Sequence, residues 1–508
     1  PDTPAWARLV RESNSRLLHL INWWFTVRQR PDGQLGGGWG DDVEALRPMA
    51  PVMILSDSHP DARKGMKRLV DGAWEKAEGG LELGYSKKLW DVEHSAEPSA
   101  DTQPLMLAFR PEDKTYIARN ELLIPLIRDL WTVKRPEGRY FKSVNMSALE
   151  VEKSPDLRAF VPYHMRAMKG LSWLVWHGGN PEAKKLYLEL ADAWVHGVMR
   201  NGDGKLSGVV PAAIDPEDGS LGAGTGDWYR PNLMWTYYNW TQANHKRAFG
   251  LLTAAYLASG DDKYFEPIAR SVEQALAFRG SAGWVPPEPE SGEMPSAEFQ
   301  RYHLNQWHRN GFYVPYILAY KHAADSDRFD AYLEELAANP DCPPLIRYQI
   351  TGNTDEVTAS IESDLEAKLR YNLPMLTTEV QATDSIKQWP GPITMYVLVS
   401  GALTSWGDAF WPTHIVTWSH PNSDWAALTR RTGRRTAKVR FFNFDNKNET
   451  FGVNLWNLPK GDYRITGSQA GENKTLFETE MRLNDLTNEL KVRIPVNEEI
   501  EILIGPPE

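Results

Sequence analysis

The residues Leu257-Ala258-Ser259-Gly260-Asp261-Asp262 interrupt an apolar helical pattern, and a second helical pattern follows over Lys263–Phe278. Glycine accepts the left-handed backbone conformation in which many helices end, and aspartate caps the start of the next helix. The interruption therefore predicts a tight hairpin of two helices. Breaks of similar composition lead into three further segments, which are Ala62–Trp74, Glu182–Met199 and Arg328–Ala338.

Repetition of such hairpins predicts a mainly α fold over residues 1–430, an α-solenoid or its closed form, the (α/α) toroid. The segment Glu182–Met199 is amphipathic, because its apolar residues share one face at helical spacing. That face carries Leu186, Leu190, Ala193, Trp194, Gly197 and Val198. Long loops rich in Gly, Pro and aromatic residues connect the hairpins, and ordered loops of such length usually carry function. They cover residues 30–48, 82–104, 201–235 and 280–312.

The pattern changes to short strands after Gly433, where apolar and polar residues alternate. Five strands are predicted, at Thr436–Phe444, Phe451–Trp456, Asp462–Gly467, Glu489–Val496 and Glu499–Ile504. They form a small antiparallel β domain over residues 434–508, a sheet or a sandwich, which packs on the helical domain as a structural element.

The composition excludes several classes of protein. The 508 residues carry a net charge of −11, and no basic face is evident, so we expect no nucleic-acid partner. No apolar run reaches the length that spans a bilayer, so no membrane span is expected. The chain begins at Pro1 without Met, which fits a processed or trimmed chain. We expect a periplasmic or secreted location. The 21 tryptophans suit a glycan partner, because indole rings stack on sugar faces.

A first acidic motif follows three successive glycines, in the run Trp39-Gly40-Asp41-Asp42. One of the two aspartates occupies a helix N-cap position. Several carboxylates so close together repel one another, which raises the pKa of at least one and prepares a general acid. We therefore consider Asp41 or Asp42 a candidate acid, with simple helix capping as the alternative.

A second acidic motif lies at 91–102, where His94, Glu97 and Asp101 have near-helical spacing. An inverting glycosidase needs a second carboxylate that holds water against the opposite face of the sugar, and Glu97 or Asp101 could provide it. With only one histidine, these residues make a poor metal site, so we expect no metal and no cofactor. The run Asn201-Gly202-Asp203-Gly204 resembles half of a calcium loop, but it lacks the ligating Glu and predicts a turn.

Three further clusters combine Tyr, His, Asn and Arg with tryptophan. These residue types suit proton abstraction next to a uronate carboxylate, because Asn or Arg neutralises the carboxylate while His and Tyr act as base and acid. The candidate residues are Tyr163, His164 and Arg166 in the first cluster, Trp228, Arg230, Asn232, Trp235, Tyr238, Asn239 and His245 in the second, and His303, His308 and Arg309 in the third.

The hairpin repeat resembles that of the α/α-toroid carbohydrate-active enzymes over roughly residues 10–430. Within them, Trp39-Gly40-Asp41-Asp42 is similar to the Trp-x-Asp-Asp element of the uronyl hydrolases, and this similarity implies that Asp42 acts as an acid on a uronic-acid glycan. The Tyr, His, Arg and Asn clusters look more like those of toroid polysaccharide lyases of the heparinase and alginate-lyase type. The small C-terminal β domain departs from the large sandwich common in those lyases.

Three functions remain open, and glycoside hydrolysis of an oligo- or polysaccharide is the first. It uses Asp41 or Asp42 as acid, Glu97 or Asp101 as base, and Trp39, Trp228 and Trp235 as the sugar platform, while His164, Arg166 and Arg309 hold a uronate carboxylate. The second is β-elimination by a lyase or dehydratase, with Tyr163 and His164, or Tyr238 and His245, as acid and base. The third is a helical protein that binds glycans without catalysis.

Overall fold

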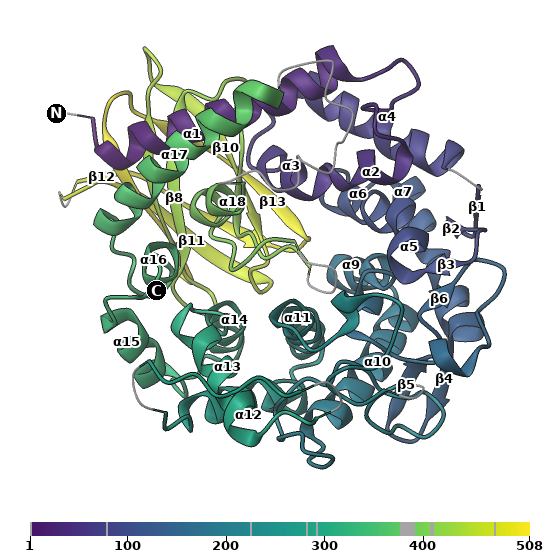
Figure 1. Cartoon of the computed structure of the whole chain (residues 1–508). Coiled ribbons are helices and arrows are strands. Elements are labelled where there is room, and N and C mark those ends of the chain that lie inside the picture. The colour runs from purple at the N-terminus through teal and green to yellow at the C-terminus, as the bar shows by residue number, and fades with distance from the viewer. Residues whose placement is uncertain are drawn as a thin grey trace. The chain divides into compact units, whose positions relative to one another are not determined.

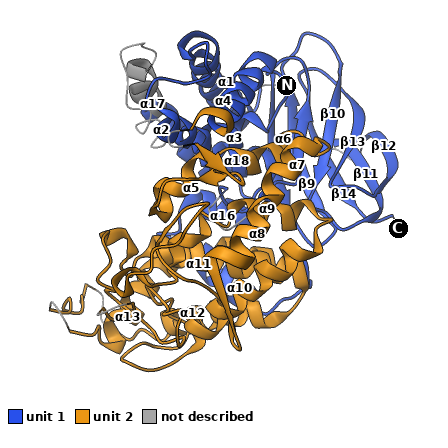
Figure 2. Ribbon diagram, turned by 90° about the vertical axis from the view of Figure 1, so that its right-hand side faces the viewer, with its two compact units in different colours: residues 1–73, 321–406, 412–508 blue, residues 74–320, 407–411 orange. Residues whose placement is uncertain are grey.

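The computed structural model describes residues 3–77, 80–223, 226–280, 283–290, 293–375, 392–406, 411–471 and 474–507. Contacts divide the chain into two compact units, which Figure 2 colours separately. Unit 1 comprises residues 1–73, 321–406 and 412–508, and unit 2 comprises residues 74–320 and 407–411. The chain is mainly helical, with an antiparallel β region toward its C-terminus.

Unit 2 consists of helices and short two-stranded sheets (Figure 1). Its elements are β1 (Leu81–Glu82), β2 (Tyr85–Ser86), β3 (Trp90–Asp91), α5 (Val92–Ala100), α6 (Gln103–Phe109), α7 (Lys114–Glu121), α8 (Leu123–Pro125), the π-helix η2 (Leu126–Trp131), β4 (Thr132–Arg135), β5 (Gly138–Phe141), β6 (Asn145–Met146), η3 (Pro155–Leu157), η4 (Pro162–Met165), α9 (Lys169–His177), α10 (Pro181–Met199), η5 (Thr236–Tyr238), α11 (Gln242–Ser259), η6 (Asp262–Tyr264), α12 (Glu266–Leu276) and α13 (Ala297–Arg309). Helices α4 (Pro60–Lys76) and α14 (Val314–Ala324) cross the boundary between the units.

The predicted helical hairpins are confirmed, and capping residues explain where they turn. Helix α9 ends at Gly178 with φ +84°, and the side chain of Asn180 then accepts a hydrogen bond from the amide of Ala183 over 2.9 Å. Helix α11 likewise ends at Gly260 with φ +73°, after which Asp261 caps η6. The predicted apolar face of α10 is buried throughout, and α10 packs against α9 and α11.

The turn predicted at residues 201–204 is also present, and a buried cation holds the segment around it. Asp203 has the left-handed φ of +52°, and Gly202 pairs with Lys205. The ammonium of Lys205, 1% exposed, donates hydrogen bonds to the carbonyls of Val198, Leu206 and Val209 over 2.8–2.9 Å. All three N–H bonds of the ammonium thus point at backbone oxygens of the surrounding segment.

Unit 1 combines helices from both ends of the helical sequence with the β region. Its helices are α1 (Ala5–Trp23), the π-helix η1 (Trp24–Arg28), α2 (Trp39–Glu44), α3 (Leu46–Met53), α15 (Asp330–Ala338), α16 (Pro344–Thr351), α17 (Asp355–Met375) and α18 (Pro392–Ser400). Its strands are β7 (Val416–Ser419), β8 (Trp425–Arg431), β9 (Ala437–Asn443), β10 (Glu449–Trp456), β11 (Gly461–Gln469), β12 (Thr475–Leu483), β13 (Thr487–Ile494) and β14 (Glu499–Gly505). Helix α1 packs on α17 and β8, and α18 packs on β8 and α3.

The strands form two antiparallel sheets, one ordered β13-β10-β7 and the other β12-β11-β14-β9-β8. Aromatic rings fill the space between them. Phe441 of β9 lies 4.4 Å from Trp418 of β7 and 5.0 Å from Phe451 of β10, measured between ring centroids. The β region is therefore a sandwich. It begins at Val416, earlier than the predicted boundary at residue 434, because β7 and β8 belong to these sheets.

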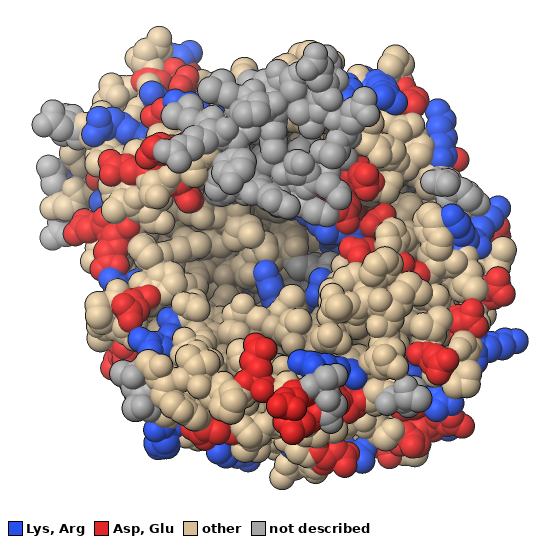
Figure 3. Space-filling model, viewed as in Figure 1, with Lys and Arg blue, Asp and Glu red and all other residues tan. Residues whose placement is uncertain are grey.

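Two further observations concern the whole of the described chain. Within its described parts, no helix is both long and apolar enough to span a membrane. Acidic and basic side chains are interspersed over the face shown in Figure 3, and uncharged residues separate them. The closed ring predicted from the hairpin repeat stays a prediction.

Candidate functional site

The predicted acidic motif of unit 1 lies at the start of α2, and its two aspartates differ in exposure. Asp41 is exposed, whereas Asp42 is fully buried. The carboxylate of Asp42 accepts hydrogen bonds from the amides of Leu35, Gly36 and Gly37 over 2.6–3.1 Å. Three amide donors stabilise the anion and oppose its protonation. The glycine run thus folds around Asp42. The role of this carboxylate in the structure is to stabilise the backbone of that run.

Trp39 also packs within unit 1, because its indole lies against α4. A Cβ atom added at Gly72 would lie 2.4 Å from the Trp39 ring, so only glycine at this position leaves room for the indole. Glu44, two residues after Asp42, pairs with Arg47 over 2.7 Å.

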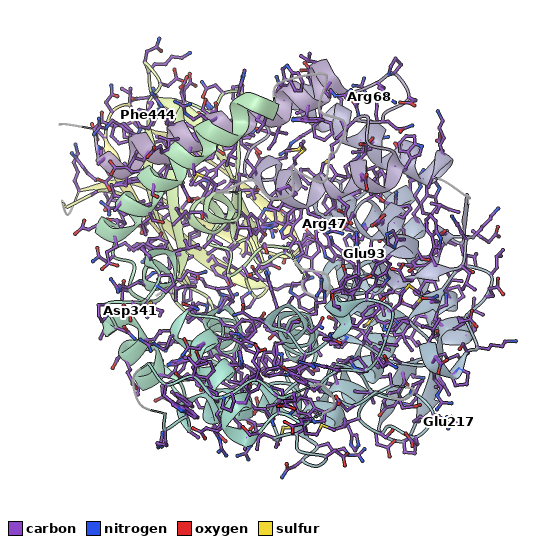
Figure 4. All side chains as sticks on the ribbon, in the orientation of Figure 1. Arg47, Arg68, Glu93, Glu217, Asp341 and Phe444 are labelled. Atoms are coloured by element: carbon purple, nitrogen blue, oxygen red, sulfur yellow. The ribbon has the colours of Figure 1, made fainter. Side chains whose placement is uncertain are left out.

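The second acidic motif forms the start of α5 in unit 2, where the sequence brings acidic side chains onto one face. The side chain of Asp91 caps the helix by accepting hydrogen bonds from the amides of Glu93 and His94. Glu93, Glu97 and Asp101 follow at intervals of four residues, so their side chains occupy neighbouring positions along one face. Figure 4 labels Glu93 on this helix.

Two buried cations face these carboxylates. The guanidinium of Arg166, 1% exposed, lies 2.8 Å from Glu93, 3.7 Å from Glu97 and 2.7 Å from Asp101. Lys169, at the start of α9, lies 3.3 Å from Asp101. Because Asp101 itself is buried, its charge is compensated within the protein, and Asp101 cannot reach a substrate.

Three tyrosines adjoin the carboxylates. The hydroxyl of Tyr163 donates a hydrogen bond to Glu93 over 2.7 Å, and the ring of Tyr163 lies 4.8 Å from Tyr237 and 5.8 Å from Tyr238. Burial raises the pKa of Tyr237 and of Tyr238 far above the usual value, and the charge of Asp91 raises both further. Neither hydroxyl makes a well-formed hydrogen bond within the described chain, and both stay protonated at neutral pH.

A carboxylate and an imidazole form the exposed part of the same cluster. The Nδ1 atom of His94 lies 2.6 Å from the carboxylate of Asp91, whose side chain is 8% exposed, while that of His94 is 46% exposed. The ring of Trp90 meets His94 edge to face at 5.7 Å. Asp91 therefore orients the imidazole and leaves its Nε2 edge to solvent, which is the arrangement of a histidine that transfers protons.

We call these residues the α5 cluster. It consists of Asp91, Glu93, His94, Glu97, Asp101, Tyr163, Arg166, Lys169, Tyr237 and Tyr238. Its four carboxylates face two permanent cations, which leaves a formal charge of −2 when His94 is neutral. Arg247 of α11 borders the cluster, with its guanidinium 4.1 Å above the ring of Tyr163.

Two predicted catalytic histidines lie in the interior of unit 2. His164 is fully buried, and its ring nitrogens contact the carbonyl of Ser143 and the backbone of Val161. Burial lowers the pKa of His164 to about 4. His245 is also fully buried, and it accepts a hydrogen bond from the amide of Val210 over 3.2 Å. Burial lowers its pKa to about 3. Both rings hold backbone segments together, so His164 and His245 have structural roles.

The other predicted residues of the second cluster are divided between interior and surface. Trp228 is buried and donates to the carbonyl of Asp203 over 2.8 Å, whereas Arg230 and Asn232 are exposed. Trp235, 39% exposed, stacks parallel to Tyr237 at 5.9 Å and so adjoins the α5 cluster. The backbone carbonyl of Asn239 accepts a hydrogen bond from Asn244.

The third predicted cluster lies on α13. His303 is partly buried among the rings of Phe299 and Trp240, at 4.4 and 5.7 Å. Burial lowers the pKa of His303. His308 is half-buried, and Arg309 at the end of the helix is exposed. Of the predicted site residues, the structure thus brings together His94, Glu97, Asp101, Tyr163, Arg166, Tyr238 and Trp235.

Comparison with known proteins adds little to this geometry. No protein-family model and no curated protein matches the chain. Among solved structures, it is similar to a family 76 glycoside hydrolase from a bovine Bacteroides thetaiotaomicron strain, with 9% identity, 76% of each chain covered and a TM-score of 0.41. A similarity at this level identifies neither a family nor a substrate, so the function has to be argued from the residues of the site.

Five residues of the site were not predicted from the sequence, and Lys169, at the start of the buried helix α9, is one of them. Asp91 and Glu93 stand in the acidic motif, and their positions as N-cap and as first member of an acidic face are visible in the spacing. Tyr237 adjoins the predicted Tyr238. Nothing in the sequence marks Arg247 as a residue of the site, because a basic residue in a helix is usually solvated. Only the fold places Arg247 over the ring of Tyr163.

Proposed function

We propose that the protein is a glycoside hydrolase that cleaves an oligo- or polysaccharide at the α5 cluster. The charge of the cluster is the observation that carries this proposal. Hydrolysis passes through a transition state with positive, oxocarbenium-like charge on the sugar, and the net negative charge of the cluster, −1 while His94 still holds the proton that it donates, stabilises that transition state. The same charge would destabilise the enolate that forms when a uronate undergoes elimination.

The exposed edge of α5 supplies an acid and a base in adjacent positions. His94 and Glu97 lie three residues apart, so they are neighbours on one helix face. In the proposed reaction His94, held by Asp91, gives a proton to the leaving glycosidic oxygen. Glu97 takes a proton from the water that attacks the anomeric carbon. One water is consumed, and the two protons balance when His94 recovers its proton from Glu97 through solvent.

The remaining residues of the cluster position this pair. Arg166 holds Glu93 and Asp101 and thereby fixes the inner side of α5. Tyr163 donates to Glu93, and the stacked rings of Tyr237 and Trp235 offer a flat surface for a sugar next to it. Arg247 lies over the ring of Tyr163 at the border of the cluster, and in this proposal it binds a substrate carboxylate, so the substrate is a uronic-acid glycan.

Elimination at a uronate is the second candidate, and one observation favours it. The Tyr238 hydroxyl is buried, protonated and without a well-formed hydrogen bond in the described chain, as a proton donor to a leaving oxygen would be. His94 would then remove the proton next to the carboxylate, and Arg247 would neutralise that carboxylate. A role in degrading large glycans also agrees with the expected periplasmic or secreted location.

The test is product analysis on soluble glycans with His94→Gln and Glu97→Gln. We expect new reducing ends from the wild type without the ultraviolet absorbance of an unsaturated uronate, and a loss of roughly 10²- to 10⁴-fold in kcat for either variant. His196→Gln, at an exposed position of α10, is the matched control and should keep wild-type activity. An unsaturated product would show that the reaction is elimination and not hydrolysis. Glycan binding without any product would show that the protein binds glycans without catalysis.

A further inference from the structure

Unit 2 carries a second aromatic surface, which is separate from the α5 cluster. Phe278 and Trp284 stack nearly parallel, with ring centroids 6.2 Å apart and an interplanar angle of 18°. Tyr302 of α13 meets Phe278 edge to face at 5.5 Å. We call Phe278, Trp284 and Tyr302 the distal platform.

Exposed apolar residues are frequent in the sequence segment that carries Phe278 and Trp284. In the described chain, eleven large apolar side chains are exposed, and four of them lie between residues 276 and 294. They are Leu276, Trp284, Val285 and Met294, with exposed fractions from 41% to 62%. Concentrated exposure of this kind marks an interaction site, because a single exposed apolar residue is common but a group of them is not.

The polar groups around the rings indicate what the platform binds. Arg301 hydrogen-bonds Gln274 over 3.1 Å, and Arg279 donates to the carbonyl of Leu276 over 2.7 Å. Glu298 lies 4.0 Å from Arg301 on the same helix. Flat rings bordered by planar donors and acceptors suit a pyranose, whose faces carry C–H groups and whose edge carries hydroxyls.

The platform is preorganised, which reduces the cost of binding. Prolines follow Trp284 at positions 286, 287 and 289, and Pro286 is buried. Proline fixes the backbone φ angle, so the segment that carries Trp284 loses little freedom when a ligand binds.

Ring contacts lead from the platform toward the α5 cluster. Tyr302 contacts His303 at 5.3 Å, and His303 contacts Trp240 at 5.7 Å. Trp240 follows Tyr237 and Tyr238 of η5 by two to three residues. The two sites belong to the same unit, and the ring contacts that lead from one toward the other pass through His303 and Trp240.

We propose that the distal platform is a glycan-binding subsite that holds a pyranose of the same chain several sugar units from the bond that is cleaved. This inference rests on the proposed function, since it takes the substrate to be a glycan, and it deepens it by assigning a long substrate. Chains too short to reach Trp284 would bind only at the α5 cluster.

The experiment is affinity electrophoresis in gels that contain polygalacturonate, alginate, xylan or galactomannan. The proteins carry Tyr163→Phe to limit turnover. Trp284→Ala should weaken binding to the retarding polysaccharide roughly threefold to tenfold, as expected for one lost aromatic stack, while Trp284→Phe should retain most of it. Leu149→Ala removes another exposed apolar side chain of unit 2, 60% exposed against 41% for Trp284, and is the control.

Activity assays complete the test. In the otherwise wild-type chain, Trp284→Ala should raise KM for the long polymer and leave kcat/KM for a short oligosaccharide unchanged. The proposal is wrong if Trp284→Ala is retarded as strongly as the parent protein, or if Leu149→Ala loses as much retardation as Trp284→Ala. It is also wrong if Trp284→Ala disrupts a dimer and keeps its glycan binding. Retardation that depends on Trp284 in a protein without any cleavage activity would support the subsite while refuting the proposed hydrolase.

Discussion

Tyr163 and Glu93 lie 70 residues apart in the sequence, and the phenol of the first donates a 2.7 Å hydrogen bond to the carboxylate of the second. The same carboxylate oxygen accepts a hydrogen bond from Arg166 over 2.8 Å. Two donors thus hold the Glu93 carboxylate oxygen from two sides. The tyrosine adds little to the compensation of charge, and its main effect is to fix the direction of the carboxylate at the exposed edge of α5.

Replacing Tyr163 by Phe tests this relationship. The change removes one hydrogen bond to a charged group, worth about 1.5–3 kcal/mol, so kcat/KM on a cleaved glycan should fall roughly tenfold to a hundredfold. Tyr140→Phe is the matched control, because the Tyr140 hydroxyl is buried and has no hydrogen-bond partner in the described chain. Equal activity of the two variants would show that Tyr163 contributes only packing.

Asp42 should affect stability more than chemistry. Asp42→Ala leaves the amides of Leu35, Gly36 and Gly37 without their acceptor, and we expect a loss of about 2–4 kcal/mol in the free energy of unfolding. Chemical denaturation measures that loss. Activity per folded molecule should stay within a few-fold of wild type at low temperature. A folded Asp42→Ala variant without activity would instead show that Asp42 is the general acid, as the sequence suggested.

Arg166 should be the most sensitive position of the α5 cluster. Arg166→Met leaves Glu93 and the buried Asp101 without their main cation, and removal of one partner from a buried ion pair costs about 3–5 kcal/mol. Denaturant unfolding with circular dichroism gives the value. Lys64→Met removes the cation of an exposed pair and should change the free energy of unfolding by less than about 1 kcal/mol.

Stability should fall in mild acid because of the buried histidines. Burial lowers the pKa of His164 to about 4 and that of His245 to about 3, whereas both have the ordinary value of about 6.5 in the unfolded chain. Between these values the unfolded chain binds more protons, so the free energy of unfolding decreases as the pH falls from 6.5 toward 4. Each histidine contributes a slope of up to about 1.4 kcal/mol per pH unit.

Unfolding measured at several pH values checks this slope. His164→Gln should flatten the dependence by about one histidine's share, whereas His196→Gln at the surface should leave it as in the wild type. A wild-type stability that does not change between pH 6.5 and 4 would contradict the assignment of neutral, buried rings to His164 and His245.

Helical hairpins were predictable because their signals are local. Gly260 and Asp261 mark where one helix ends and the next begins. The apolar residues of α10 recur at the helical period and so indicate its buried face. Strand β8 was missed because five of its seven residues are buried in succession, so the sequence shows no alternation. Strand β7 is short and almost entirely buried, which again leaves no two-residue period. Strand β12 does alternate, since Phe477, Met481 and Leu483 are separated by charged residues, and its pattern was overlooked.

The site was only partly predictable, because its residues come together through long-range packing. Glu97 and Asp101 were placed in an acidic motif on α5, but the cation that faces them, Arg166, was interpreted as a ligand for substrate. His164 looked like a base since it adjoins Tyr163, yet the neighbouring residues of η4 point in different directions. Sequence proximity gives the composition of a site, whereas burial decides which of its members can meet a ligand.

The three carbonyl oxygens around the Lys205 ammonium have a consequence for handling the protein. Many proteins stabilise a converging set of backbone oxygens with calcium or sodium taken from the medium, and their loops loosen when the ion is withdrawn. Here the group that donates to these oxygens is a side chain of the protein itself. The conformation of residues 198–209 is therefore stabilised by the polypeptide itself. We expect that chelators such as EDTA, or dialysis to low salt, leave it unchanged.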